Sequence, residues 1–193
     1  MKTFLLVASL LLTSCSLPAE QLIVFAKGDV LVLENGKAPS PPKDPAKRAF
    51  VQAVTTDLDH PTAFAPAIAL VSPPEWGRTV PGANGRIEFH PAFRGGFLVR
   101  VRIQGLAPDH RYILTLNGNP KLDGNDRLAD AVPNLPAERY LDFCTVTTDA
   151  HGAYQSTFAI ALLSGPYDVR FYVKDTADFK IVLYHDYFKF SVE

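Results

Sequence analysis

Cysteine, methionine and tryptophan are scarce in this 193-residue sequence, which contains two, one and one of them respectively. With only Cys15 and Cys144, the chain lacks the several disulfides that hold many small secreted domains together. Cys144 lies in the strand-like run LDFCTVTT, with no base beside it. We therefore interpret Cys144 as a buried apolar side chain and not as a nucleophile.

An excess of charge is also missing, because 19 basic residues face 20 acidic ones and the net charge is −1. This balance argues against a nucleic-acid partner. A glycine-rich phosphate loop, a G-x-S-x-G motif and a histidine pair at zinc-binding spacing are all absent from the sequence. The sequence therefore favours a protein that binds or scaffolds over an enzyme.

The N-terminus carries a mostly apolar run from Phe4 to Leu12, preceded by Lys2. This run has the length of a signal-peptide core and is well short of the ~20 apolar residues that span a bilayer as a helix. We predict that residues 1–14 are a signal peptide and that the protein is exported.

The tetrapeptide LTSC at positions 12–15 resembles the lipobox of bacterial lipoproteins. That resemblance implies that Cys15 is acylated and anchors the protein to a membrane, since two or more acyl chains give stable attachment. Ser16 stands where the family's retention signal would place Asp, which implies the outer membrane if the host has one. The alternative is a secreted or periplasmic protein cleaved near Ser16 or Ala19.

The segment from residue 15 to residue 48 differs in composition from the rest of the chain. Residues 21–34 predict two short strands around a turn. Four prolines between Pro39 and Pro45 then predict an extended linker over residues 35–48. We expect a boundary near residue 48, followed by one domain over residues 49–193 that opens with a strand at 49–54.

Alternating apolar and polar residues dominate the remainder of the chain. Along FLVRVRIQ at 97–104, one face carries only apolar residues and the other carries Leu98, Arg100, Arg102 and Gln104, which predicts a strand buried on one side. Turn residues at 149–152 predict a hairpin, and those at 164–166 and 175–178 separate later strands. The other predicted strands lie at 67–71, 85–90, 112–117, 140–147, 153–162, 167–174 and 179–192. This pattern predicts an all-β, antiparallel β-sandwich.

The sequence Leu-Ala-Pro-Asp-His-Arg-Tyr at 106–112 resembles the tyrosine corner of fibronectin type III and related immunoglobulin-like domains. In that family the tyrosine hydroxyl forms a hydrogen bond with the backbone a few residues upstream. The resemblance implies an immunoglobulin-like sandwich and the same contact from Tyr112. It implies nothing about function, because such sandwiches have many unrelated roles.

Two polar groups are candidates for a metal or ligand site. His185 and Asp186 interrupt an otherwise apolar strand, and we interpret them as a β-bulge that turns both side chains outward or as a hydrogen-bonded pair at a sheet edge. The alternative is a metal or ligand site, such as a zinc site, that they form with His90 or His60.

The loop that contains Asp123, Asn125 and Asp126 offers oxygen ligands for calcium. Its spacing does not match the EF-hand motif, and Asn, Asp and Gly are common turn residues. We therefore predict that the protein has no cofactor, and a bound calcium or zinc ion is the alternative.

Basic residues form two pairs on the polar faces of predicted strands. Arg100 and Arg102 share one strand and Arg170 and Lys174 share another. If both strands belong to one sheet, they form a basic stripe that suits acidic glycans or lipid head groups. The interpretation that we favour is a solvated face balanced by Asp168 and Glu88.

Taken together, these features predict an exported, lipid-anchored β-sandwich that binds or scaffolds in the cell envelope. Its expected partners are another envelope protein or a polysaccharide, met through loops or an exposed sheet face. The alternative is a metal-assisted enzyme that uses His185 and Asp186.

Overall fold

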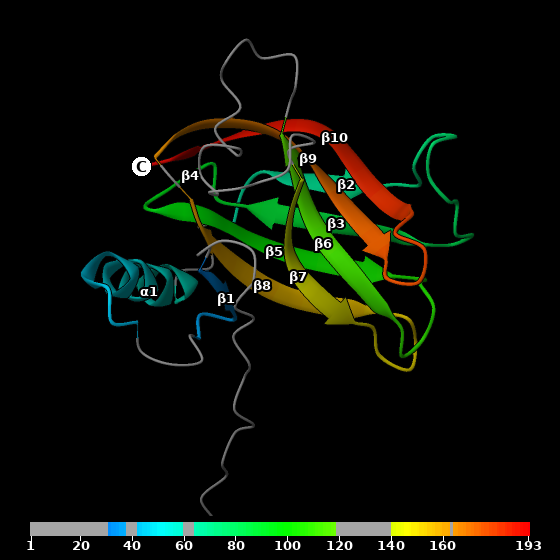
Figure 1. The fold of residues 1–193 in the computed structure, drawn as a ribbon, viewed down its shortest axis with the longest axis horizontal. Helices are drawn as coiled ribbons and strands as arrows, with labels where there is room; N and C mark the ends of the chain where they lie inside the picture. The colour runs from blue at the N-terminus through cyan, green and yellow to red at the C-terminus, as the bar shows by residue number, and fades with distance from the viewer. Residues whose placement is uncertain (1–30, 38–41, 60–63, 119–139, 163) are drawn as a thin grey trace, which may run out of the picture.

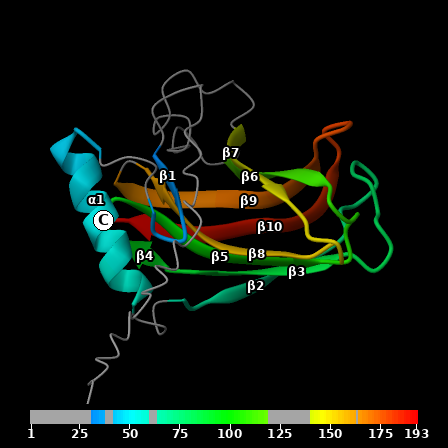
Figure 2. The same ribbon diagram turned by 90° about the horizontal axis from the view of Figure 1, so that it is seen from below.

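A computed structural model describes residues 31–37, 42–59, 64–118, 140–162 and 164–193. Within these ranges the chain forms ten strands and one helix, and the strands make two five-stranded sheets (Figure 1). The two sheets lie in layers, as Figure 2 shows from the side. The prediction of an all-β, two-layered fold is confirmed.

The sheets are called A and B. In spatial order, sheet A contains β1 (Val32–Glu34), β8 (Tyr154–Ala161), β5 (Gly96–Gln104), β3 (Asn84–Phe89) and β2 (Ala67–Leu70). Sheet B contains β4 (Ala92–Phe93), β10 (Ile181–Val192), β9 (Gly165–Asp175), β6 (Arg111–Gly118) and β7 (Tyr140–Thr147). Neighbouring strands are antiparallel, except that β4 runs parallel to β10.

The core lies between the sheets and is rich in phenylalanine. The predicted inward side of β5 is buried as expected: Phe97, Val99, Val101 and Ile103 are 0, 0, 0 and 3% exposed. Phe97 stacks on Phe190 of sheet B, with ring centroids 4.2 Å apart. Each such side chain contributes about 1.5–3 kcal/mol when it leaves water, so this interface is the main source of stability.

The turn at residues 149–152 forms, but it does not make the predicted hairpin. It joins β7 of sheet B to β8 of sheet A, and these two strands do not pair. The Asp149 carboxylate accepts hydrogen bonds from the backbone N–H groups of His151 (2.8 Å) and Ala153 (2.9 Å). The residue types therefore predicted the local turn correctly, but they hold no information about which strands flank it. The turn at 175–178, in contrast, does join two paired strands, β9 and β10.

The connection from β5 to β6 also crosses between the sheets, and it contains the contact predicted for Tyr112. The Tyr112 hydroxyl accepts a hydrogen bond of 3.1 Å from the backbone N–H of Ala107. Its ring is buried, and burial raises the pKa of the phenol. The predicted hydrogen bond is confirmed.

Helix α1 (Pro45–Leu58) replaces the strand that we predicted at 49–54 and the last part of the predicted linker. Pro45 occupies the first helical position, where its missing N–H group is not needed. The backbone N–H of Arg48 donates to the Asp44 carbonyl oxygen (3.0 Å) and closes the first turn. A short apolar run does not distinguish a strand from a helix, and Phe50 and Val54, four residues apart, form its buried face. The expected boundary near residue 48 falls inside this helix.

Helix α1 lies across one end of the sandwich, near β4 and the C-terminus (Figures 1 and 2). It packs Phe50 and Val54 against Leu98 and Ala159, which lie on the outer face of sheet A. Leu98 is therefore fully buried, and our prediction that its face of β5 is solvent-exposed is wrong at this end. None of the helices among the described residues is long and apolar enough to cross a membrane.

Strand β1 attaches the N-terminal part of the described chain to sheet A. It pairs with β8, with Val32 opposite Ile160. The Glu34 carboxylate accepts hydrogen bonds from the hydroxyls of Tyr154 (2.6 Å) and Ser156 (2.7 Å). The second strand predicted within 21–34 therefore exists at 32–34, while residues 21–30 lie outside the described ranges.

Candidate functional site

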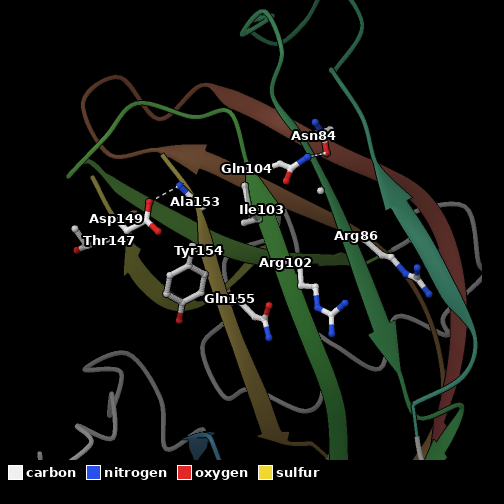
Figure 3. A pocket seen from close by; sticks show the side chains of 11 residues that line it. Asn84, Arg86, Arg102, Ile103, Gln104, Thr147, Asp149, Ala153, Tyr154 and Gln155 are labelled. Carbon is white, nitrogen blue, oxygen red and sulfur yellow. Dashed lines mark hydrogen bonds between the residues drawn. The ribbon is translucent and has the colours of Figure 1, made fainter. Parts of the chain in front are cut away.

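The outer face of sheet A is hollowed at the end opposite α1. The hollow has a volume of about 640 Å³ and is lined by the start of β3, the end of β5, the start of β8, and the end of β7 of sheet B with the turn that follows it (Figure 3). Its size falls within the range of about 300–1,000 Å³ that is usual for ligand sites. Most of its lining residues are polar, chiefly Asn84, Arg86, Arg102, Gln104 and Gln155, while apolar atoms make up slightly more than half of its surface.

The pairing of three strands arranges these side chains in two rows. Arg86 of β3 lies opposite Arg102 of β5, and Arg102 lies opposite Gln155 of β8. Asn84 and Gln104 form the second row, two residues further along. Because neighbouring strands are about 4.8 Å apart, the first row extends about 10 Å across the sheet.

Hydrogen bonds hold the second row in place. The Gln104 side-chain amide donates to the Asn84 side-chain oxygen (3.0 Å), and the Asn84 amide donates to the Gly82 carbonyl oxygen (3.1 Å). This chain of hydrogen bonds fixes the orientation of both amides.

The first row is only partly neutralised. Glu88 forms ion pairs with Arg86 (3.0 Å) and Arg100 (3.2 Å). Arg102 has neither a hydrogen bond nor an ion pair with any residue in the described part of the chain, and the Gln155 side chain likewise has no partner there. A guanidinium and an amide therefore remain available to a ligand in the hollow.

Two groups at the rim of the hollow already have partners. Burial, and then the neighbouring Glu34, raise the pKa of Tyr154, whose hydroxyl donates to Glu34. Backbone N–H groups of Ala153 and His151 lower the pKa of Asp149. Tyr154 is therefore held as a neutral phenol, and the Asp149 carboxylate is occupied by the backbone of its own turn.

His185 and Asp186 lie at an irregularity of β10, where the pairing with β9 shifts between His185 and Phe188. The His185 ring Nδ1–H donates to the Ala69 carbonyl oxygen (2.9 Å). Asp186, whose side chain is 66% exposed, accepts from the Arg170 Nε (2.8 Å). The two side chains therefore have separate partners, as expected for a bulge.

His90, which the sequence predicted as a further ligand, has partners of its own. His90 accepts a hydrogen bond from the Ala92 N–H through Nδ1 (3.3 Å) and packs on Phe93. Among the described residues, no group of three or more His, Cys, Asp or Glu side chains could hold a metal ion. The remaining predicted residues lie outside the described ranges, so these predictions stay open: Cys15, His60, Asp123, Asn125 and Asp126.

The predicted single basic stripe is wrong, because β5 belongs to sheet A and β9 to sheet B. On sheet B, Arg170 pairs with Asp186 and Lys174 with Asp142. On sheet A, Arg102 gains Arg86 and Gln155 as neighbours, which sequence analysis did not select. Arg86 lies in the strand predicted at 85–90, but strand register was needed to bring it opposite Arg102.

Cys144 agrees with the interpretation of a buried apolar side chain. It lies on β7 within the core, and burial raises the pKa of its thiol well above the usual range. A thiol held in this protonated form is a poor nucleophile.

A second titratable cluster lies away from the hollow and has a structural role. The buried Asp175 carboxylate binds His110 Nε2 (2.8 Å), the Ala177 N–H (2.8 Å) and Arg78. Burial raises the pKa of Asp175, but these hydrogen bonds outweigh it and hold the pKa below its ordinary value. The cluster attaches the β9–β10 hairpin to the segments that carry Arg78 and His110.

Comparisons with known proteins find no matching family model, no significantly similar curated protein and no significantly similar solved structure.

Proposed function

We propose that this protein is an exported, lipid-anchored β-sandwich that binds a polysaccharide of the cell envelope through the hollow on sheet A. The observation that carries the proposal is the polar lining of that hollow, with Arg102 and Gln155 unengaged within the described part of the chain. A polysaccharide presents many hydroxyl groups, which suit fixed amides and guanidinium donors.

The chemistry of the lining favours a polysaccharide over an envelope protein as the partner. The centres of protein–protein interfaces are depleted of charged residues and enriched in aromatic ones. The hollow has one aromatic side chain, Tyr154, among its lining residues, and three side-chain amides lie on its floor (Figure 3).

Two features of the sequence support the proposed anchor. They are the predicted signal peptide at residues 1–14 and the LTSC tetrapeptide at 12–15. Acylation of Cys15 would hold the domain at a membrane, where a polysaccharide-binding face could attach the membrane to surrounding polymer. We expect Cys15→Ser to move the protein from the membrane fraction to the soluble fraction. Continued membrane association of this variant would contradict the proposed anchor.

We also infer an immunoglobulin-like strand arrangement. Such sandwiches place strands A, B and E in one sheet and C, F and G in the other. The orders β3–β5–β8 and β6–β9–β10 support this assignment, with β5 as strand B and β6 as strand C. On this assignment the Tyr112 contact lies in the connection between strands B and C, whereas the family has it between strands E and F. Aligning the chain to the family by this tyrosine alone would therefore assign β6 to the wrong strand.

A glycan array tests the proposed binding. The full-length protein, purified in detergent, should bind at least one polysaccharide. Gln104→Trp places a large side chain in the hollow and should weaken that binding by about tenfold or more. Arg94→Trp is the matched control, because Arg94 is exposed on the turn before β5, away from the hollow.

Failure to bind any polysaccharide would reject the proposed function. Capture of a purified envelope protein that is lost in Gln104→Trp would show instead that the hollow binds a protein. Equal effects of the two tryptophan substitutions would remove the hollow from the binding site.

A further inference from the structure

We propose that the hollow recognises an anionic group of its polysaccharide, a carboxylate or a phosphate, and that Arg102 and Gln155 bind this group. The inference rests on the proposed function and names the chemical class of ligand at the same site. It predicts discrimination between charged and neutral polymers with the same backbone.

The first argument is the charge on the outer face of sheet A. On β3, β5 and β8, the charged side chains that alternate onto this face are Arg86, Arg100, Arg102 and Glu88. Glu88 already pairs with two of the three arginines. Within these strands the face therefore has more positive than negative charge, and Arg102 is the arginine that forms no ion pair with Glu88.

The second argument is the register. Arg86 and Arg102 are directly opposite each other on neighbouring antiparallel strands. Like charges at opposite positions destabilise a sheet. An anion bound between the strands would remove this repulsion, so the folded protein and an anionic ligand would stabilise each other.

The third argument is the geometry of the donors. Arg102 and Gln155 are cross-strand neighbours, and their side chains extend beside each other at the hollow in Figure 3. A guanidinium offers two parallel N–H donors that match the oxygens of a carboxylate or phosphate, and the amide adds another donor. Asp149, the acid that lines the rim, is occupied by its own turn and does not pair with Arg102.

The second row suits the rest of a sugar unit. The hydrogen-bonded pair of Gln104 and Asn84 lies two residues further along the strands, about 6.7 Å from the first row. A polymer placed with its anion on Arg102 would therefore present its hydroxyls to these amides.

Isothermal titration calorimetry of the full-length protein in detergent tests the inference. The three probes are polygalacturonate, its fully methyl-esterified form and poly(glycerol phosphate). The ester has the same sugar backbone without the charge, so it should bind about tenfold more weakly than the acid. Comparison of polygalacturonate with poly(glycerol phosphate) shows whether the hollow prefers a carboxylate or a phosphate. Tight binding of either acidic polymer supports the inference.

Two substitutions assign the anion to Arg102. Arg102→Gln should weaken binding of the acidic polymer by about tenfold and leave binding of the ester unchanged. Arg102→Lys keeps the charge without the planar donors and should lose less than Arg102→Gln. Arg94→Gln removes an arginine from the turn before β5 and should bind as the unmodified protein does.

The outcomes separate this inference from the proposed function. If acid and ester bind equally, or if Arg102→Gln and Arg94→Gln behave alike, the anion site is rejected while polysaccharide binding stands. If no polymer binds here or on the glycan array, both proposals are rejected. Circular dichroism of each variant shows whether it is folded, and Arg102→Lys provides a second measurement if Arg102→Gln is not.

Discussion

The two ends of the outer face of sheet A have opposite chemistry, although they belong to the same strands. Along β5, Leu98 is fully buried, Arg100 is half-buried, and Arg102 and Gln104 are exposed. Helix α1 covers the Leu98 end with Phe50 and Val54, and the hollow occupies the other end.

This difference shows how one sheet face can serve both stability and binding. Apolar side chains at the covered end gain free energy when α1 excludes water from them. Arginines and amides at the open end would lose their hydration under a helix and would need new partners. The helix therefore stabilises one half of the face, and the other half remains accessible to a ligand.

Placing a charge at the covered end should have the largest effect. Leu98→Arg buries an unpaired guanidinium beneath α1, and we expect a loss of about 5 kcal/mol in the free energy of unfolding or detachment of the helix. Urea unfolding measures the first result and limited proteolysis of residues 45–58 the second. A change below about 0.5 kcal/mol, with α1 still protected, would contradict the described covering.

Arg102→Leu is the matched substitution at the open end, four residues further along the same face of β5. Arg102 is exposed and has no partner among the described residues, so we expect a stability change within about 0.5 kcal/mol. A large loss would show that the open end also contributes to stability.

Truncating the side chain by which α1 packs on sheet A should have the next largest effect on the free energy of unfolding. Phe50 is buried against Phe93, with ring centroids 6.2 Å apart, and Phe50→Ala should cost about 3–4 kcal/mol in urea unfolding. Thr55→Ala, on the exposed side of the same helix, is the control and should change stability by less than about 0.5 kcal/mol. Equal effects of the two would mean that α1 does not pack through Phe50.

No helix of the described chain covers the open end, and the connection from β5 to β6 lies at this end of the sandwich. It carries the hydrogen bond between Tyr112 and Ala107. Tyr112→Phe removes the hydrogen bond to the Ala107 N–H and should destabilise the domain by about 1–2 kcal/mol. Tyr184→Phe, whose ring packs on Trp76, serves as the control and should have a smaller effect. If both substitutions destabilise the domain equally, the hydrogen bond of the Tyr112 hydroxyl does not contribute specifically to stability.

Acid should weaken the turn at the rim of the open end slightly. Hydrogen bonds from the Ala153 and His151 N–H groups hold the pKa of Asp149 below its usual value of about 3.9. The carboxylate thus contributes stability above its unfolded pKa, and this contribution is lost as pH falls through the lower folded pKa. The melting temperatures of the unmodified protein and of Asp149→Asn should differ at pH 6, and the difference should shrink as the pH falls below the usual pKa of the carboxyl group. A difference that is constant with pH would contradict this linkage.

Sequence patterns predicted the strands of the C-terminal half well, because alternation with period two is a local signal. The inward side of β5 was predicted from the alternation of residues, and the Tyr112 hydrogen bond was predicted from the resemblance to a tyrosine corner. Helix α1 was missed, since AFVQAV suits either a strand or a helix and neighbouring prolines argued against helix. The hairpin at 149–152 was wrong because a turn sequence does not specify the sheet to which the next strand belongs.

Part of the candidate site was also visible in the sequence. Arg100 and Arg102 were recognised as a polar face that suits acidic glycans, but they were grouped with Arg170 and Lys174, which belong to the other sheet. Arg86 and Gln155 were not selected, since their proximity to Arg102 depends on strands that are about 15 and 50 residues away in the chain.

The order of residues by itself determined the export signal expected at the N-terminus, the alternation of the strands and the all-β class. These properties depend on neighbours one to seven residues apart, so they can be read along the chain. Tertiary structure alone decided the pairing of Arg86 with Arg102 and the covering of Leu98 by α1. Register and helix docking are set by burying apolar surface across the whole domain, and that free energy belongs to no single segment.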